Sequence, residues 1–389
     1  METKTYKLDS LCEITSSKRI FYSEYTESGI PFFRSKEIID LFNKNNIATE
    51  LFISKDRYNE IKNKFGVPEK DDMLLTSVGS IGIPYLVKSS DKFYFKDGNL
   101  TWFRNYNRKL IVPLYLYLWT TSSVGKETLM RLSMGAAQPA LTISRLKNLS
   151  LNLPSVSVQQ KIASILSTYD RLIENNTRRI RLLEQMAENL YKEWFVRFRF
   201  PGHENVEMVN GLPKGWKINS LKEICEFKRG RNITSAEMCD GIIQVISAGV
   251  APSGYHNEAN VHGVSVTMSS SGANAGYISI HYDDIWAADC SYISDKETED
   301  IYYVYELLNN IRQVINNFQI GAAQPHVYPK DINKIKTCVP PKDLRIKANT
   351  NISKIHKEIH KLYKQNQLLT RQRDLLLPRL MSGKLEVKS

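Results

Sequence analysis

A heptad repeat of apolar residues dominates the middle of the chain. Over residues 158–196, apolar side chains recur every seven positions in two interleaved series, which is the a/d pattern of a coiled-coil seam. The pattern returns over residues 342–382, and each copy carries one asparagine, Asn176 and Asn366, a residue type that fixes register in many coiled coils. We predict two long helices whose seam residues are Leu166, Ile173, Ile180, Leu183 and Leu190 in the first copy and Ile352, Ile355, Ile359, Leu362, Leu369 and Leu376 in the second.

Two regions outside the helices have a different pattern. They contain short aromatic and β-branched runs, such as residues 92–95, 241–246 and 277–282, interrupted by Gly, Ser and Asn. This pattern predicts mixed α/β domains with irregular strands and exposed loops. The expected fold class is α+β, with a first head over residues 1–156, a helix over 157–198, a linker over 199–215, a second head over 216–341 and a second helix over 342–382.

The chain contains an internal repeat. The pentapeptide GAAQP occurs at residues 135–139 and at 321–325, and the segments that follow align without a gap at an offset of 186. Near the start of each head, residues 6–14 resemble residues 216–224 at an offset of 210, which predicts a second head shorter by 24 residues. The heads share almost no sequence between these anchors. A repeated framework therefore carries two variable parts.

Chain order predicts how the helices run. The first helix leads from the first head to the second, and the second helix can return, so we expect an antiparallel pair with the heads related by a pseudo-two-fold axis. A helix over residues 158–196 would be about 58 Å long, at ~1.5 Å per residue. Heads held inboard of its ends could contact one face of a DNA duplex about one turn apart, ~10 bp.

The charge balance indicates a polyanionic partner. Lys and Arg number 53 against 41 Asp and Glu, a net charge of +12, which favours nucleic acid or an anionic membrane surface. The membrane alternative is weak, because the longest apolar run, residues 110–119, falls short of the ~20 residues that span a bilayer and the N-terminus lacks a signal-peptide core. The 5 cysteines are far apart and show no CxxC spacing. We expect a soluble, cytoplasmic protein with no membrane partner.

The framework resembles that of the specificity subunits of type I restriction–modification systems. The resemblance is carried by the GxxQP turn, the LxLP strand, the QQKI helix start and the LLEQMAENLYKEWF helix of the first copy. The second copy matches more loosely, at residues 326–331 and 343–346. The resemblance covers nearly the whole chain.

This resemblance implies a non-catalytic subunit that reads a bipartite sequence in double-stranded DNA. Each head, a target recognition domain, would read one half-site, and the helices would set the spacer and dock methyltransferase subunits. Heads of unequal length then imply two different half-sites and a non-palindromic target. The expected partners are two adenine N6-methyltransferase subunits and, for cleavage, ATP-driven restriction subunits. S-adenosylmethionine, ATP and Mg would be bound by those partners, and no cofactor by this chain.

Motifs of self-contained enzymes are missing from the sequence. There is no GxxxxGK[ST] phosphate loop, and no [ND]PP[YFW] motif of amino-methyltransferases. His356 and His360 have the spacing of a helical metal pair, but Lys357 stands where a zincin needs glutamate. We expect these histidines to be solvated on a helix face, and we expect no catalytic residue and no metal site.

Basic residues supply the first candidate DNA contacts. Two groups fall at comparable places in the two heads at the offset of 210, and a third follows a pair of phenylalanines in the first head. The candidates are Lys18 and Arg19, then Lys228, Arg229 and Arg231, and finally Arg34 with Lys36. Lys and Arg neutralise phosphates, although a solvated basic surface explains the same pattern.

Small-residue loops and two glutamines supply the remaining candidates. Residues 77–82 and 269–276 lack bulky side chains and could bring backbone amides close to DNA; within them we single out Ser77, Ser80, Ser271 and Asn274. Gln138 and Gln324 of the GAAQP turns have amides that could pair with adenine. Because both heads carry them, a shared backbone contact or a structural hydrogen bond suits them better than base discrimination.

Three alternatives stay open at the level of sequence. The chain could serve a methyltransferase that has no restriction partner. It could be a coiled-coil scaffold whose basic heads bind RNA or acidic proteins. An enzyme with an unrecognised site is the weakest, because no catalytic constellation recurs in both heads.

Overall fold

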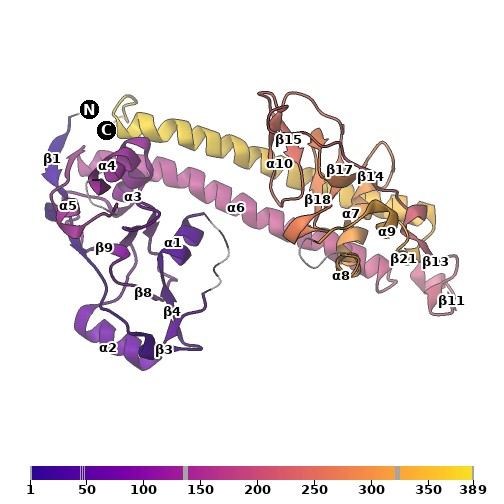
Figure 1. The fold of residues 1–389 in the computed structure, drawn as a ribbon, viewed down its shortest axis with the longest axis horizontal. Helices are drawn as coiled ribbons and strands as arrows, with labels where there is room; N and C mark the ends of the chain where they lie inside the picture. Colours follow the sequence, from indigo (N-terminus) through magenta and orange to yellow (C-terminus); the bar gives the residue numbers. More distant parts are fainter. Residues whose placement is uncertain are drawn as a thin grey trace. The chain divides into compact units, whose positions relative to one another are not determined.

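Both predicted long helices are present in the computed structural model (Figure 1), which describes residues 2–43, 45, 47, 49–134, 139–319 and 325–387. Helix α6 spans Val156–Phe195 and helix α10 spans Lys342–Met381. The chain divides into two compact units, residues 1–173 with 367–389 and residues 174–366. Each unit contains one head and a part of each long helix. The predicted α+β class is confirmed.

The first head is built from short strands in three sheets within the described residues. Strand β1 pairs with β10, one four-stranded sheet has the order β2–β9–β6–β7, and the other has the order β3–β5–β4–β8. The strands are β1 (Lys4–Lys7), β2 (Glu13–Thr15), β3 (Tyr25–Thr26), β4 (Ile30–Phe33), β5 (Phe52–Ile53), β6 (Met73–Thr76), β7 (Pro84–Leu86), β8 (Tyr94–Phe95), β9 (Leu100–Arg104) and β10 (Ser150–Leu153). The expected strand at residues 92–95 is therefore found as β8.

In the described part of the first head, the shorter α-helices are α1 (Ser35–Phe42), α2 (Lys55–Phe65), α3 (Pro113–Thr121), α4 (Ser123–Ser133) and α5 (Ile143–Lys147). Their starts follow ordinary capping chemistry. The hydroxyl of Ser54 accepts the backbone N–H of Arg57 at 3.1 Å, and Ser122 accepts that of Gly125 at 3.1 Å. Pro113 opens α3, where its missing N–H costs nothing. The apolar run at residues 110–119 thus becomes a helix of the head.

In the first unit, the start of α6 packs antiparallel to the end of α10. Leu166 and Leu380 are fully buried in one apolar cluster with Leu8 and Leu11 of the head. Arg373 of α10 forms an ion pair with Asp170 of α6 at 2.7 Å. Leu369 and Leu376 are half-buried, so the seam here is narrower than predicted.

The second head repeats this architecture with fewer elements. Strand β13 pairs with β21, a four-stranded sheet has the order β14–β20–β17–β18, and a three-stranded sheet has the order β16–β15–β19. The strands are β13 (Lys217–Ser220), β14 (Lys228–Arg229), β15 (Ile243–Ile246), β16 (Gly254–His256), β17 (Ser265–Ser269), β18 (Ile278–His281), β19 (Ile285–Ala287), β20 (Cys290–Ser294) and β21 (Lys336–Val339), and the helices are α7 (Ile301–Asn310), α8 (Arg312–Asn316) and α9 (Pro329–Ile332). Two expected strands are confirmed as β15 and β18.

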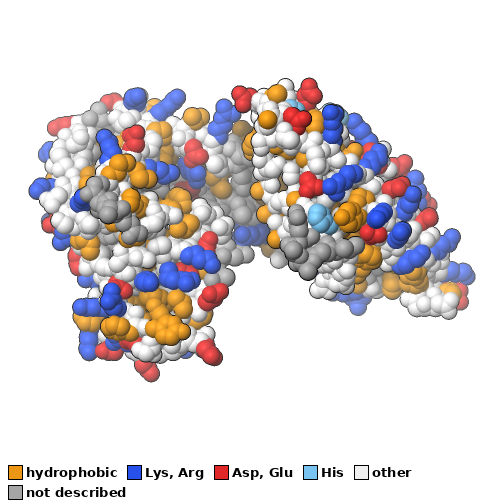
Figure 2. Space-filling model, viewed as in Figure 1, with side chains coloured by type: hydrophobic (Ala, Val, Ile, Leu, Met, Phe, Trp, Pro, Cys, Tyr) orange, Lys and Arg blue, Asp and Glu red, His pale blue; other side chains and the backbone are white. Residues whose placement is uncertain are grey.

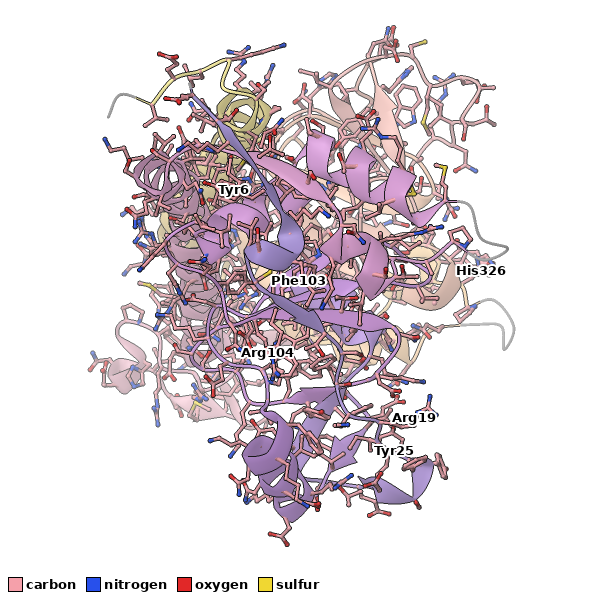
Figure 3. The ribbon with its side chains drawn as sticks, turned by 90° about the vertical axis from the view of Figure 1, so that its left-hand side faces the viewer. Tyr6, Arg19, Tyr25, Phe103, Arg104 and His326 are labelled. Carbon is pink, nitrogen blue, oxygen red and sulfur yellow. The ribbon has the colours of Figure 1, made fainter. Side chains whose placement is uncertain are left out.

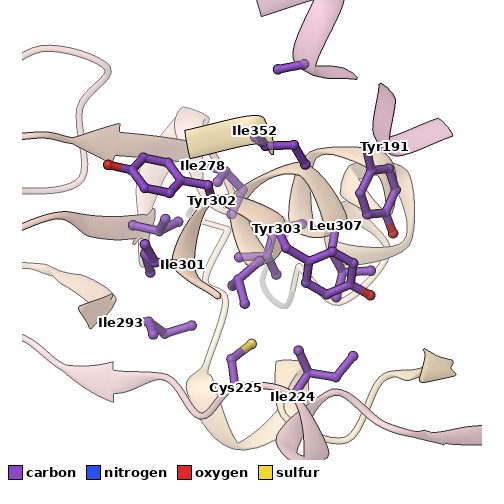
Figure 4. Close-up of a cluster of buried hydrophobic side chains, with 14 of the residues drawn as sticks. Tyr191, Ile224, Cys225, Ile278, Ile293, Ile301, Tyr302, Tyr303, Leu307 and Ile352 are labelled. Atoms are coloured by element: carbon purple, nitrogen blue, oxygen red, sulfur yellow. The ribbon is translucent and has the colours of Figure 1, made fainter. Parts of the chain in front are cut away.

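In the second unit, the end of α6 packs antiparallel to the start of α10. The predicted asparagines meet: the amide of Asn176 donates to the amide oxygen of Asn366 at 3.0 Å. Ile180, Ile352 and Ile359 are buried, and Leu183 and Leu190 are half-buried against the same core. Figure 4 shows this core, in which Ile352 of α10 and Tyr191 of α6 lie close to side chains of α7. The predicted seam is therefore buried at its isoleucines and half-buried at Leu183 and Leu190 in this unit.

The strand register corrects the alignment of the two copies. Lys4 pairs with Leu153, and Lys217 pairs with Val339. Since Leu153 and Val339 are equivalent at the offset of 186, the offset at the start of the heads is 213 and not 210. The predicted match was wrong by three positions, because short alternating runs align almost equally well in several registers. The second head is thus 27 residues shorter, the difference between offsets of 213 and 186, and not 24.

Most of the length difference lies in one connection. Forty positions separate Phe33 from Met73, whereas 20 separate their equivalents Ile246 and Val266. The first head uses the extra chain for α1 and α2. The heads share strand order despite having almost no sequence in common, so the variation lies in the connections and not in the sheets.

The segment between α6 and the second head is ordered by aromatic packing. The ring of Phe200 stacks on that of Trp216 at 5.6 Å, and the short strands β11 (Met208–Val209) and β12 (Leu212–Pro213) form a hairpin. The predicted linker therefore contains a folded turn.

Candidate nucleic-acid interface

The two small-residue loops fold alike. In the first head the loop connects β6 to β7, and the backbone N–H of Gly82 donates to the carbonyl of Thr76 at 2.8 Å. In the second head the loop connects β17 to β18, and the backbone N–H of Gly276 donates to the carbonyl of Ser269 at 2.9 Å. Both closing glycines have a positive φ, 82° and 81°, a conformation that side chains other than glycine rarely adopt. The loops are thus a repeated feature of the framework.

Each loop is fastened to the chain just after its GAAQP sequence. Val78 forms a β-bridge with Ala140, and Ser271 forms one with His326, labelled in Figure 3. Backbone hydrogen bonds add to both bridges: Leu141 donates to Ser77 at 2.9 Å, and Val327 donates to Ser270 at 3.0 Å. The candidates Gln138 and Gln324 lie outside the described residues.

The side chains of the loops divide into buried and exposed ones. Ser77 is 3% exposed and its hydroxyl lies 2.6 Å from that of Thr101, so its side chain cannot reach a ligand. Ser271 is also buried and donates to Asp289 at 2.7 Å. Ser80 and Asn274 are exposed. The hydroxyls of the two buried serines complete hydrogen bonds inside the head and are not available to DNA. Contacts through the backbone amides of these loops stay a prediction.

In the second head, the basic strand β14 and the small-residue loop meet at one carboxylate. Asp289 pairs with Arg229 at 2.5 Å through one oxygen and accepts the Ser271 hydroxyl through the other. Lys228 pairs with Glu297 at 2.9 Å. Burial acts to raise the pKa of Glu297, but hydrogen bonds from Ser294 and Lys228 outweigh it and keep this pKa below its usual value. The cations of this strand are thus held at fixed positions on an exposed edge.

In the first head, the basic candidates have more varied surroundings. Arg19 is 69% exposed and pairs with Asp97 at 3.1 Å. The ammonium of Lys18 lies 4.5 Å from the ring centre of Phe65. Arg34 pairs with the buried Glu37 at 2.7 Å at the start of α1, which makes it part of a helix cap. Lys36 is exposed.

The corrected register changes which basic residues correspond. Thr15 pairs with Trp102, and Lys228 pairs with Tyr292, the equivalent of Trp102. Lys228 therefore corresponds to Thr15, and the counterpart of Lys18 is Arg231. The prediction that Lys18 and Lys228 occupy comparable places is wrong by three residues.

A recess in the second head contains polar residues that sequence reasoning missed. It has a volume of about 230 Å³ and lies among β15, β17, β18 and residues 247–252. Gln244 and Ser279 line it, and among the described residues neither side chain has a hydrogen-bond partner. His281, also in the lining, contacts the Thr267 hydroxyl at 2.8 Å. These side chains can donate hydrogen bonds to a base edge and accept them from it. The spacing of the three residues along the sequence does not indicate that they share a recess.

Acid should destabilise the second unit through His281. Burial lowers the pKa of this histidine to about 4, whereas an unfolded histidine titrates near ~6.5. Between these values the unfolded state binds more protons, so the stability present above pH ~6.5 is lost as the pH falls towards 4. We expect His281→Gln to lose less melting temperature than the wild type between pH 7.5 and pH 5. The control is His262→Gln, because His262 is 54% exposed; equal acid losses in wild type and His281→Gln would contradict this prediction.

Basic residues of the second head should contribute to a salt-dependent affinity for DNA. Replacing Lys228, Arg229 and Arg231 with alanine should weaken binding and reduce the slope of log K against log salt by about 2 to 3, since each lost phosphate contact removes ~0.9. The control replaces Lys192, Arg197 and Lys214, three cations that also form ion pairs with carboxylates but lie outside the heads. An unchanged slope in the first variant would exclude phosphate contacts by Lys228, Arg229 and Arg231.

Two further expectations concern catalysis and membranes. Among the described residues, no group of three or more His, Cys, Asp or Glu side chains is arranged to hold a metal ion. No helix in the described part of the chain is long and apolar enough to cross a membrane.

The expectation of solvated histidines on α10 is wrong for His356. Its side chain is 1% exposed, lies 3.2 Å from a carboxylate oxygen of Glu306 and 2.8 Å from the hydroxyl of Tyr282. His360 is 31% exposed and stacks on Tyr282 at 5.0 Å. The pair joins α10 to the second head and serves packing.

Comparisons with known proteins agree with the repeated framework. A family described as the type I restriction modification DNA specificity domain matches residues 1–185 and 213–376. The specificity subunit of the type I restriction enzyme MjaIX from Methanocaldococcus jannaschii is 28% identical over 349 residues, which cover 82% of this chain and 78% of the relative. That of the enzyme HindI from Haemophilus influenzae is 22% identical, covering 89% and 93%. The crystal structure of a type I S subunit from M. genitalium has a TM-score of 0.64 at 20% identity, covering 100% of this chain and 97% of that one, and so shares the fold.

Proposed function

Because the chain belongs to the family of type I restriction–modification DNA specificity subunits, we propose that each of its heads reads one half of a bipartite DNA target. The observation that supports this most is the repeated architecture. Both heads place a fastened small-residue loop at the same point of the same sheet order. Both heads carry exposed cations at the first strand of that sheet. In the first head Lys18 and Arg19 follow β2, and in the second head Lys228 and Arg229 form β14. One molecule thus offers two similar DNA-reading surfaces.

The two half-sites should differ, which makes the target non-palindromic. The first head has α1 and α2 where the second has a connection 20 residues shorter, and the recess lined by Gln244 lies in the second. Base readout depends on the side chains that reach base edges. Surfaces that differ this much in shape would select different bases.

The long helices would set the gap between half-sites and dock methyltransferase subunits. Both α6 and α10 continue from one unit into the other, and we propose that their length sets the gap. Both helices also expose large apolar side chains: Leu172, Leu182 and Met186 on α6, and Leu368 and Leu375 on α10, are 43–60% exposed. Exposed apolar patches mark protein-binding surfaces, and we propose that these side chains contribute to the docking surfaces.

The chemistry would belong to partner subunits. We propose that two adenine N6-methyltransferase subunits bind S-adenosylmethionine, that restriction subunits bind ATP and Mg for cleavage, and that this chain supplies neither catalytic residues nor a cofactor. The complex would act on cytoplasmic DNA.

A genome-wide map of N6-methyladenine tests the proposal. Cells that express this chain with its neighbouring methyltransferase are compared with cells that lack only this chain. We expect a chain-dependent motif of two different short half-sites separated by a fixed gap. Absence of any chain-dependent methylation, with both proteins folded and associated, would contradict the proposal and favour a scaffold that binds RNA or protein.

A further inference from the structure

The same capped turn occurs in both heads. It follows β2 in the first head and β14 in the second, the first strands of the equivalent four-stranded sheets. In the first head, the backbone N–H of Phe21 donates to the Glu24 carboxylate at 2.7 Å, and the N–H of Glu24 donates back to the Phe21 carbonyl at 2.9 Å. In the second head, Thr234 and Glu237 make the same two bonds at 2.7 and 3.0 Å. The offset between the turns is 213, as the strand register requires. This turn, which we call the capped turn, is thus a second repeated feature of the heads.

The capped turn of the first head holds two aromatic rings in solvent. Phe21 is 61% exposed and Tyr22 is 90% exposed. Ile20 just before them is buried, and Tyr25 just after them packs against Phe32 at 5.2 Å between ring centres. The turn is therefore rigid at both ends while its tip points away from the core.

The two aromatic residues are not needed to build the turn. At the equivalent positions the second head has Thr234 and Ser235, which are also exposed. The glutamate cap is the same in both heads, so the scaffold accepts either pair of side chains. A fixed scaffold with two interchangeable exposed positions is what a recognition element requires.

Exposed cations lie near the aromatic tip. Arg19 lies two residues before Phe21; its side chain is 69% exposed and pairs with Asp97 at 3.1 Å. Lys18 is exposed beside Phe65, itself 44% exposed. Glu24 is neutralised by Arg57 at 2.7 Å. Figure 3 places Arg19 and Tyr25 at the same end of the first head, and Figure 2 shows hydrophobic side chains there bordered by both basic and acidic side chains.

We propose that Phe21 and Tyr22 insert into the DNA duplex at the first half-site and unstack one base step. Apolar side chains that kink DNA in this way are presented by a rigid protein surface, and flanking cations hold the phosphates on either side. Lys18 and Arg19 would make those phosphate contacts. In the second head, the Thr234 hydroxyl donates to the Glu237 carboxylate at 2.8 Å. Ser235 offers a hydroxyl that can bond to DNA, and neither side chain can unstack a base step. The inference rests on the proposed function, since it assigns residues to the first half-site.

The test uses the complete chain in complex with its methyltransferase subunits and duplexes that carry the motif found by methylation mapping. The fluorescent base 2-aminopurine replaces each adenine within or beside the two half-sites in turn, except the adenine that is methylated in each half-site, because methyltransferases flip their target base out of the stack. With the wild type, we expect fluorescence to rise at one step of the first half-site, because unstacking relieves quenching. We expect no such rise at the second half-site.

Tyr22→Ala and Phe21→Ala should abolish the fluorescence rise and weaken DNA binding roughly 10-fold to 100-fold. Tyr22→Trp should keep both, since a larger ring still stacks. The control is Tyr255→Ala, which removes a 56% exposed tyrosine from the second head and should leave the signal at the first half-site unchanged. Because Tyr22 is almost fully exposed, its replacement should not change the melting temperature.

Several outcomes would overturn the inference and leave the proposed function intact. One is a methylation motif that stays unchanged while Tyr22→Ala binds DNA within twofold of the wild type and no position fluoresces. Another is loss of the methyltransferase subunits from Tyr22→Ala on size-exclusion chromatography, which would assign the tip to a protein contact. A wild-type complex that methylates no chain-dependent motif would instead contradict the proposed function itself.

Discussion

Seven residues inserted into α6 after Ile173, together with seven inserted into α10 after Asn366, should eliminate methylation at the wild-type motif. Both insertions fall where each helix passes from one compact unit to the other. A heptad preserves the a/d seam and adds about 10 Å, which is ~3 bp of DNA. We expect the remaining methylation to shift to a motif with the same half-sites and a wider gap. Sequencing of methylated genomic DNA measures both effects.

The control for this variant adds the same length elsewhere. Seven residues after Asn210, at the exposed tip of the β11–β12 hairpin, should leave the motif and its gap unchanged. Wild-type methylation at the original motif by the doubly extended chain would show that the helices do not set the gap.

Asp300→Ala should cause a large loss of stability in the second unit. Its carboxylate pairs with Arg345 of α10 at 2.6 Å, and the two side chains are only 6% and 10% exposed. Removing one partner leaves a buried charge without compensation, which costs about 3–5 kcal/mol. Chemical or thermal unfolding of the purified chain measures the change.

Two matched variants separate the buried charge from other effects. Replacing Asp300 with leucine and Arg345 with methionine in the same chain should recover most of the stability, because no unpaired charge is left. Asp283→Ala breaks an exposed ion pair with Lys364 at 2.7 Å and should cost ~1 kcal/mol or less. If Asp300→Ala were no more destabilising than Asp283→Ala, the Asp300–Arg345 pair would not hold α10 to the second head.

The sequence predicts the long-range framework of this chain well, because that framework is periodic. The heptads at Ile180, Ile352 and Ile359 identify the seam, and the asparagines at 176 and 366 meet as the pattern indicates. A period of seven over 40 residues is a signal that local packing rarely imitates. The offset of 186 after the GAAQP turns also holds, since helices of equal length follow both copies.

The interior of the heads was less predictable. The alignment at an offset of 210 was wrong because strands of four residues carry too little pattern to fix their register, and only the pairing of Lys4 with Leu153 reveals it. The buried state of Ser77 and His356 depends on partners far away in sequence, Thr101 and Glu306. Spacing along the chain does not show such partners.

The sequence does contain a signal for the capped turn. Glu24 and Glu237 each follow an exposed pair of residues by the same number of positions, at the offset of 213. An alignment at that offset would have joined Ile20 with Ile233 and pointed to Phe21 and Tyr22. Their exposure, however, follows only from the burial of their neighbours.

The most direct test of the central claim gives the chain two copies of one head. Residues 226–320 are replaced with residues 13–134, which moves the first head's variable part onto the second framework copy. Genome-wide mapping of N6-methyladenine should then show a motif built from two copies of the first half-site, with the second half-site lost. A motif that retained the original second half-site would contradict the claim that each head reads its own half of the target.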